Sequence, residues 1–300
     1  MLPNAQLDEQ VKMAQPRESY KVAATTLTAE DKELNLRGLM REMQTVLVAY
    51  SGGVDSSYLA LIATQELREK ALCVTGLSPS VSQKQREQAA QIAGDFKFNH
   101  QIIETDELEN PLYQANPTNR CYHCKTELYG KLVSIVEQYK IEFVLDGANT
   151  DDVGDYRPGR LAAREKNVRS PLIEVGLSKN EIRELSRKHG LPTWSQPSSP
   201  CLSSRIAYGV PVTIERLSKV ERGEEIIRGL GFREFRVRVH EELVRLEIAP
   251  SEMERALDLN VTEKLAEKFR KLGFKYVTLD LHGYRSGAMN EVLKVKKVKK

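Results

Sequence analysis

The sequence predicts an α/β protein: a doubly wound parallel sheet followed by a second, smaller α+β domain. Short β-rich apolar runs alternate with helix-patterned segments through the first two thirds of the chain. From about Val212 that alternation gives way to a weak internal repeat. With 300 residues, 40% of them hydrophobic, the chain is long enough for two packed domains. We expect an N-terminal extension (1–30), a sheet domain (31–211) and a small C-terminal domain (212–300).

The elements expected in the first domain follow one another regularly. A helix is predicted over Ala29–Met43, with Leu34, Met40 and Met43 among its apolar positions. Each later strand is followed by a helix, which is the pattern of βαβ units with a buried parallel sheet. The predicted strands are 45–50, 71–77, 99–105 and 142–145, and the helices between them are 56–67, 82–96 and 125–139.

The repeat in the second domain consists of two helix–strand units. One copy contains GLGF (229–232) and the other KLGF (271–274), each preceded by a helical stretch. Strands are expected to follow, ending at His240 and His282. The two units predict a small sheet packed against two helices.

Alternation in the strand FRVRVH (235–240) separates two faces. The valines fall on one face, and Arg236, Arg238 and His240 fall on the other. A solvated edge strand and an anion site are both compatible with this arrangement.

Charge and hydropathy exclude several classes of protein. The net charge of +3 gives no electrostatic reason to expect a nucleic-acid partner, and the basic end KVKKVKK is expected to be a solvated tail. No run of about twenty apolar residues predicts a membrane span, and the first residues lack the apolar core of a signal peptide. We therefore expect a cytoplasmic protein, in which four cysteines favour metal or thiol chemistry over disulfides.

A candidate phosphate loop, SGGVDSS (51–57), lies directly after an apolar strand and directly before a helix. Adjacent glycines, Gly52 and Gly53, let backbone N–H groups approach a phosphate without an intervening Cβ. The helix start adds the positive end of its dipole. Hydroxyl donors are available from three side chains: Ser51, Ser56 and Ser57.

Asp55 is the discordant residue of this loop. A carboxylate beside phosphates is repulsive unless a divalent cation lies between them, so Asp55 is expected to be a Mg²⁺ partner. The loop lacks the lysine of a Walker A motif. SGGxDS after the first strand resembles the PP-loop of the ATP pyrophosphatases, and the resemblance implies ATP cleavage between the α and β phosphates with adenylation of a substrate.

A second polar cluster, GANTDDVGD (147–155), follows the strand 142–145. Loops at the carboxyl ends of parallel strands gather around one crevice. Gly147 and Asp151 are therefore candidates for the nucleotide site, with Asp152 and Asp155 as further carboxylates that could face the metal. An Asp-rich turn is also ordinary loop chemistry.

Three of the four cysteines lie outside predicted strands. Cys73 falls inside a strand and is expected in the core, whereas Cys121 and Cys124 form a CxxC ahead of a helix and Cys201 lies in PSSPCLSSR. A zinc site would need a fourth ligand such as His123, and a dithiol redox pair would not need Cys201. Three thiolates could also hold a [4Fe-4S] cluster, leaving one iron free for an exchangeable sulfide.

These motifs together resemble the LarE family of ATP-dependent sulfur transferases, which build the nickel-pincer nucleotide cofactor. The resemblance covers about residues 34–290. The matching stretches are SGGVDSS, RCYHCK (120–125), GANTDD (147–152), PSSPCLSSRIAYG (197–209), FRVRVHEELVRLEI and LDLHGYRSGAMNE. It implies adenylation of a carboxylate of pyridinium-3,5-biscarboxylic acid mononucleotide and its conversion to a thiocarboxylate, with ATP and Mg²⁺.

Members of this family use one of two sources of sulfur. In one, the cysteine aligned with Cys201 gives up its own sulfur; in the other, that cysteine and a CxxC hold a [4Fe-4S] cluster whose extra sulfide is transferred. Because Cys121 and Cys124 are present, we expect the cluster route, with Cys121, Cys124 and Cys201 as ligands. Cys201 and Asp55 are the expected catalytic residues.

The substrate that the resemblance implies is an anionic mononucleotide. Planar guanidinium groups suit phosphate and carboxylate, so Arg205, Arg236 and Arg238 are candidate substrate ligands, with Glu224 on the preceding helix. We expect the chain to form a homo-oligomer and not to enter a membrane. The alternatives are a tRNA-thiolating PP-loop enzyme, an ammonia-using amide synthetase, and a non-catalytic nucleotide-binding or iron-sulfur scaffold.

Overall fold

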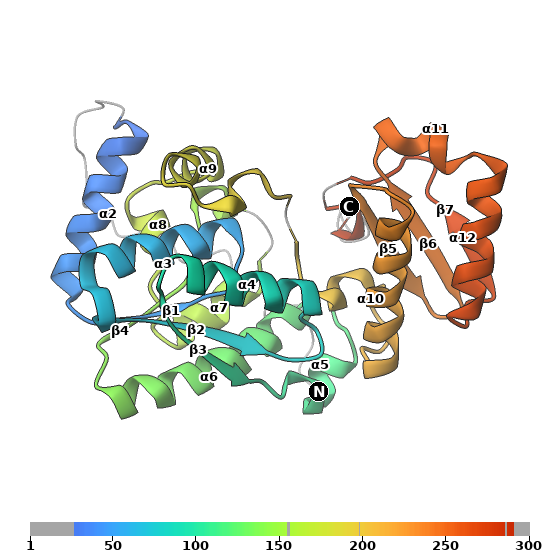
Figure 1. Cartoon of the computed structure of the whole chain (residues 1–300). Helices are drawn as coiled ribbons and strands as arrows, with labels where there is room; N and C mark the ends of the chain where they lie inside the picture. The colour runs from blue at the N-terminus through green and yellow to red at the C-terminus, as the bar shows by residue number, and fades with distance from the viewer. Residues whose placement is uncertain (1–26, 155–156, 198, 286, 291–300) are drawn as a thin grey trace, which may run out of the picture.

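A computed structural model describes residues 27–154, 157–197, 199–285 and 287–290 of the chain (Figure 1). In the first sheet the strand order is β3-β2-β1-β4, and every neighbouring pair is parallel. The bounds of the strands and helices of this domain are α2 Ala29–Met43, β1 Val46–Ala49, α3 Val54–Leu67, β2 Ala71–Leu77, α4 Gln83–Asp95, β3 Asn99–Glu104, α5 Pro111–Gln114, α6 Arg120–Tyr139, β4 Phe143–Leu145, α7 Gly159–Glu165, α8 Pro171–Glu174 and α9 Lys179–Lys188. The predicted doubly wound parallel sheet is confirmed.

The sheet separates two hydrophobic cores. On one face, α2, α3, α4 and α9 pack together with side chains of β1 and β2. On the other face, α6 and α7 cover residues such as Leu47, Leu72 and Val74. Figure 1 shows α3 and α4 on one side of the strands and α6 on the other. The near-continuous burial of β1 and β2 follows from this cover on both faces.

The structure refines two of the predicted helices. Leu34 is 63% exposed, and the buried stripe of α2 is Leu36, Met40 and Met43, which keeps the spacing of one helix face. Helix α6 begins at Arg120 rather than near residue 125, so the CxxC lies in its first turns instead of ahead of it. Cys, Tyr and His are weak helix formers, so the sequence pattern marked the helix only after them.

The second domain is a three-stranded sheet covered on one face by two helices. Its elements are α10 Ile214–Gly229, β5 Phe235–His240, β6 Leu243–Ile248, α11 Met253–Ala256, α12 Leu259–Lys271 and β7 Tyr276–Leu279. The order is β5-β6-β7, with β5–β6 antiparallel and β6–β7 parallel.

The two predicted helix–strand units are α10–β5 and α12–β7. Each passes through a glycine in the left-handed region, Gly231 (φ +86°) and Gly273 (φ +91°), and then a buried phenylalanine, Phe232 and Phe274. A cation lies over each phenylalanine ring, from Arg255 at 3.8 Å and from Lys219 at 5.8 Å. The second strand ends at Leu279, three residues before the predicted His282, because the chain turns at 280–283.

The segment that follows Cys201 joins the two domains. Leu202, Ile206 and Val212 are buried in the hydrophobic core of the second domain, together with Tyr113 of α5. Ile206 also forms a parallel bridge with Val239 of β5.

Among the helices of the described part of the chain, we find none with the length and apolarity needed to cross a bilayer.

Candidate active site

The loop after β1 is shaped around a glycine. Gly52 has φ +72°, and a Cβ at this position would lie 2.7 Å from Cβ of Ala89 on α4. A glycine is therefore needed at this position for two reasons: the backbone has a positive φ, and α4 leaves no room for a Cβ. Gly53 is the N-cap residue of α3. Because glycine has no side chain, no side-chain acceptor from the N-cap binds the first amides of this helix. Such a helix start favours an anion.

Two of the predicted serines organise this loop from within. Ser56 Oγ accepts the amide of Ser51 at 3.2 Å, and the two hydroxyls lie 3.0 Å apart. Ser51 is exposed at the mouth of the loop. Ser57, by contrast, is 0% exposed, because it points from the first turn of α3 into the protein interior.

A lysine that the sequence analysis missed joins two of the predicted carboxylates. Lys179 Nζ donates to Asp55 Oδ2 at 2.6 Å, and its backbone N–H donates to Asp151 Oδ2 at 3.1 Å. Lys179 is the first residue of α9, where a cation opposes the helix dipole, so its interaction with Asp55 offsets an unfavourable position. The capping box formed by Ser178 and Glu181 was the signal that could have placed this helix start in the sequence.

Asp55 retains one carboxylate oxygen without a partner. Oδ1 is buried and has no hydrogen bond within the described residues. Buried polar atoms are normally satisfied, so an orphaned carboxylate oxygen beside a phosphate loop fits a cation ligand. The expected Mg²⁺ partner is thus compatible with the side chain that is present.

The loop after β4 lies directly on the start of α3. A Cβ at Gly147 would lie 2.9 Å from the amide nitrogen of Ser56. Asp152 accepts the amide of Asn149 and pairs with Arg157 at 2.8 Å, so its carboxylate serves the turn itself. Asp155 lies outside the described residues.

Helix α4 connects the phosphate loop to the segment that carries Cys201. Gln88 Nε2 donates to the carbonyl of Gly52 at 3.1 Å and to Gln196 Oε1 at 2.7 Å. One turn earlier, Gln85 Nε2 donates to the carbonyl of Ser199 at 2.6 Å. Besides joining β2 to β3, α4 therefore fixes the phosphate loop relative to the Cys201 segment.

The three candidate thiols lie near one another. Cys121 and Cys124 are one turn apart on α6, and Cys201 is the N-cap of the short helix Leu202–Arg205. Cys121 is exposed, and Cys124 and Cys201 are half-buried. Burial, then Glu107 and Cys201, raise the pKa of Cys124. Contacts on either side of the cysteines bring the two segments together: Arg120 donates to the carbonyl of Ser203, and Cys124 packs against the hydrophobic core that contains Leu202.

The thiols do not form a ready metal centre. Among the described residues, no group of three or more His, Cys, Asp and Glu side chains is arranged to hold a metal ion. Three neighbouring thiols are nevertheless the donor set that an iron-sulfur cluster takes. The cysteines therefore supply the type of ligand that such a cluster needs, from two segments that contact each other.

A buried arginine fixes the backbone around Cys201. Arg205 is 2% exposed, and its Nη1 donates to the carbonyl of Cys201 at 3.1 Å and to that of Pro200. Its Nε donates to Glu224 Oε1 at 2.8 Å, from a helix of the second domain. Arg205 and Glu224, which the sequence suggested separately as substrate ligands, therefore form a buried ion pair between the Cys201 segment and α10.

Breaking this ion pair is expected to destabilise the protein strongly. Arg205→Met leaves the Glu224 carboxylate buried without its cation, at a cost of about 3–5 kcal/mol in the free energy of unfolding. Arg205→Met combined with Glu224→Leu should recover part of that loss. The control is Lys271→Met, which breaks the exposed pair with Glu267 and should leave the free energy of unfolding nearly unchanged. Equal losses for Arg205→Met and the control in urea unfolding would contradict this assignment.

Arg236 and Arg238 are buried rather than solvated. Arg238 Nη2 donates to the fully buried Glu247 at 2.8 Å, and its Nη1 donates to the carbonyl of Ser204 at 3.1 Å. Arg236 lies 4.7 Å above the ring of Tyr284, and burial, then the charges of Arg205 and Arg238, lower its pKa. The structure thus gathers the three predicted arginines, and the interpretation of β5 as a solvated edge is wrong.

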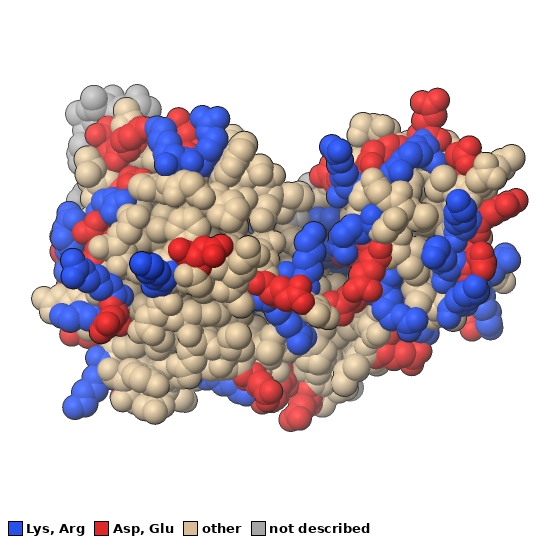
Figure 2. All heavy atoms as spheres, in the orientation of Figure 1, with Lys and Arg blue, Asp and Glu red and all other residues tan. Residues whose placement is uncertain are grey.

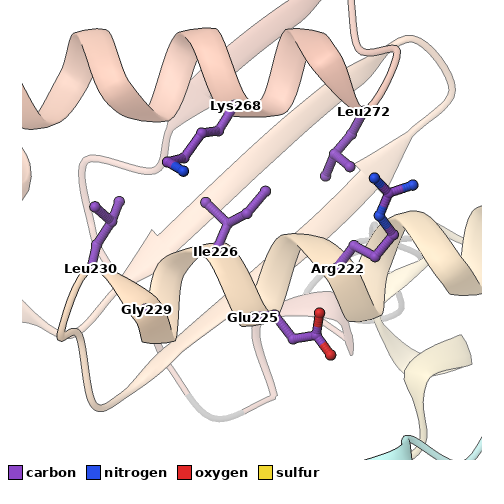
Figure 3. A pocket seen from close by; sticks show the side chains of 7 residues that line it. All are labelled: Arg222, Glu225, Ile226, Gly229, Leu230, Lys268 and Leu272. Carbon is purple, nitrogen blue, oxygen red and sulfur yellow. The ribbon is translucent and has the colours of Figure 1, made fainter.

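The surface is hollowed between the two domains, with basic side chains along the wall of the second domain (Figure 2). A cavity of about 390 Å³ lies elsewhere, between α10 and α12 (Figure 3). It is lined by Arg222, Glu225, Ile226, Gly229, Leu230, Lys268 and Leu272, and thus by no predicted site residue.

Comparison with known proteins places this arrangement in a family, although no family model matches the chain. A pyridinium-3,5-bisthiocarboxylic acid mononucleotide synthase of Lactiplantibacillus plantarum is 33% identical over 267 residues, which are 89% of this chain and 96% of that protein. Uncharacterised proteins of Synechocystis sp. and Methanocaldococcus jannaschii are 43% and 31% identical, over 88% and 85% of this chain and 98% of each relative. The chain therefore belongs to the LarE family, as its motifs predicted.

Proposed function

We propose that this protein is an ATP-dependent sulfur transferase. It adenylates a carboxylate of pyridinium-3,5-biscarboxylic acid mononucleotide and converts it to a thiocarboxylate, as the name of the L. plantarum relative suggests. The observation that carries the proposal is the link through α4: Gln85 and Gln88 hold the Cys201 segment beside the phosphate loop. Activation and sulfur delivery can then take place at one site.

The activation half uses the start of α3. Uncapped amides and the helix dipole favour the phosphates of ATP, and Lys179 supplies a cation beside them. Asp55 would hold Mg²⁺ through its orphaned oxygen, and that ion would neutralise charge on the departing pyrophosphate. The substrate carboxylate attacks the α phosphorus, the bond to the β phosphate breaks, and acyl-adenylate and pyrophosphate form.

The sulfur half uses the cysteines. Cys121, Cys124 and Cys201 would hold the [4Fe-4S] cluster, which when bound supplies a sulfide as the nucleophile. A cysteine binds iron as the thiolate, so ligation requires these side chains to lose their protons. A sulfide supplied there would bond to the carbonyl carbon of the acyl-adenylate as the bond to AMP breaks, which would give the thiocarboxylate and free AMP.

The arginines of the second domain suit the anionic substrate. Arg205, Arg236 and Arg238 place buried positive charge next to the Cys201 segment, and that charge favours an anionic substrate. We propose a homo-oligomer as the working form and no nucleic-acid partner.

Purification without oxygen tests the source of the sulfur. We expect iron and acid-labile sulfide in the protein, a visible absorption band, and an unchanged intact mass after turnover. An iron-free, colourless protein that loses the mass of H₂S at Cys201 would establish the sacrificial route instead. Binding and thiolation of tRNA, without reaction of the mononucleotide, would make the protein a tRNA-thiolating enzyme.

Lys179→Met is expected to slow the release of pyrophosphate. The variant removes the cation next to the phosphate loop and leaves Asp55 without its ion-pair partner. Loss of one electrostatic contact at a reacting phosphate costs on the order of 10²–10³-fold in rate. The measurement is pyrophosphate release with saturating ATP and substrate. Lys188→Met, which breaks exposed pairs at the other end of α9, is the control, and an equal rate in the two variants would contradict the role of Lys179.

A further inference from the structure

A buried arginine joins the two segments that carry the cysteines. Arg120 immediately precedes Cys121 and is 4% exposed. Its Nη1 donates to the carbonyl of Ser203 at 2.9 Å and to the side-chain oxygen of Asn116. Ser203 lies two residues after Cys201, so one guanidinium connects the first turn of α6 to the Cys201 segment.

Asn116 extends this connection along the same segment. It is 0% exposed and has φ +52°, a conformation that asparagine tolerates better than most residues. Its Nδ2 donates to the carbonyls of Ala207 at 2.8 Å and Val210 at 2.9 Å, and its own carbonyl accepts the amide of Gly209 at 3.0 Å. Asn116 and Arg120 together hold residues 203–210 against the start of α6.

Arg120 is a buried cation beside both cysteine segments. Within the described residues, no carboxylate lies at ion-pair distance from its guanidinium. A buried cation is costly without an opposing charge. Cys121 is the next residue along the chain, and Cys201 lies two residues before the Ser203 carbonyl that Arg120 binds. Thiolates at these cysteines, as cluster ligands, would supply negative charge beside this buried cation.

We propose that Arg120 is a positioning residue of the sulfur centre. With Asn116 it fixes Cys201 relative to Cys121 and Cys124, and it holds one buried positive charge against the negative charge of the thiolates and the sulfide. The inference rests on the proposed function, which makes these cysteines the sulfur centre. Arg120 does not contact the reacting carbonyl in this scheme, so it acts through the cysteines.

The first test uses the reduced protein without cluster, ATP or substrate. A short bis-maleimide joins thiols that are held close, and peptide mapping reports cross-links from Cys201 to Cys121 or Cys124. We expect Arg120→Gln to slow this cross-linking by about tenfold, since small displacements have large effects on proximity. Arg120→Lys should be intermediate. Arg216→Gln is the control, because Arg216 donates to the carbonyl of Pro211 on the same segment, beyond the stretch 203–210.

The second test measures the reduction potential of the cluster-loaded protein. Removing a positive charge favours the oxidised state, so Arg120→Gln should make the potential more negative, while Arg120→Lys should leave it near the wild-type value. A purely structural role would not move the potential at full iron occupancy. Wild-type cross-linking together with a wild-type potential in Arg120→Gln would overturn the proposal.

If Arg120→Gln does not fold, Arg120→Lys decides: slower cross-linking supports the proposal, and the wild-type rate overturns it. The cross-linking result is independent of catalysis. Slower cross-linking in a protein that never transfers sulfur would leave the positioning role standing and reject the proposed function. Normal cross-linking in the variants of an active sulfur transferase would reject the positioning role alone.

Discussion

Cys201→Ala is expected to stop thiocarboxylate formation while adenylation continues. In the proposed function the phosphate loop, Asp55 and Lys179 serve activation, and none of them contacts the Cys201 side chain in the described hydrogen bonds. Removing the sulfur-delivering group should lower the second step on the order of 10³-fold or more. Substrate-dependent pyrophosphate release in a single turnover should stay within about threefold, because binding and activation are retained.

Two matched variants make this result specific. Cys73→Ala removes a buried thiol of β2 that has no part in the proposed reaction, so this variant should keep full sulfur transfer. The double variant Cys121→Ala/Cys124→Ala should fail like Cys201→Ala if a cluster is the donor, and should still complete one turnover if Cys201 gives up its own sulfur. Sulfur transfer at the wild-type rate by Cys201→Ala would refute both routes.

Gly52→Ala is expected to remove ATP binding and to destabilise the fold. The new Cβ would lie 2.7 Å from Cβ and 2.9 Å from Cα of Ala89, and an alanine would have to adopt φ +72°. Strain of this kind costs about 1–3 kcal/mol, and any relief moves the loop that would receive the phosphates. We expect ATP affinity, measured by calorimetry, to fall more than about tenfold.

The control for this variant is Gly38→Ala in α2. A Cβ at Gly38 meets nothing within 4 Å, and alanine is the better helix former, so this variant should be more stable by about 0.5–1 kcal/mol. If Gly52→Ala binds ATP as the wild type does, the loop does not carry the phosphates.

The sequence predicted the sheet domain well because its signals are local. Buried parallel strands read as apolar runs, and SGGVDSS lies between such a run and a helix, so the position of the loop followed from neighbouring residues. The cysteines were likewise found by spacing. The start of α6 was missed, since Arg120 is fixed by contacts with Asn116 and Ser203 that no local pattern encodes.

The residues that the sequence did not identify act across long separations. Lys179 contacts Asp55 across 124 positions, and Gln88 contacts Gln196 across 108. Each looks like an ordinary polar residue of a helix surface. Leu34 shows the limit of composition alone, because this apolar side chain of α2 lies on the exposed face of the helix.

The contacts of α4 have a consequence for ionic strength. The side chains through which Gln85 and Gln88 reach the phosphate loop and the Cys201 segment are uncharged amides. Dissolved salt screens charges but leaves amide hydrogen bonds largely unaffected. The distance between the phosphate loop and the Cys201 segment should therefore stay constant as salt is added. A loss of turnover in high salt would then report weaker capture of the anionic substrates, with the active site still assembled.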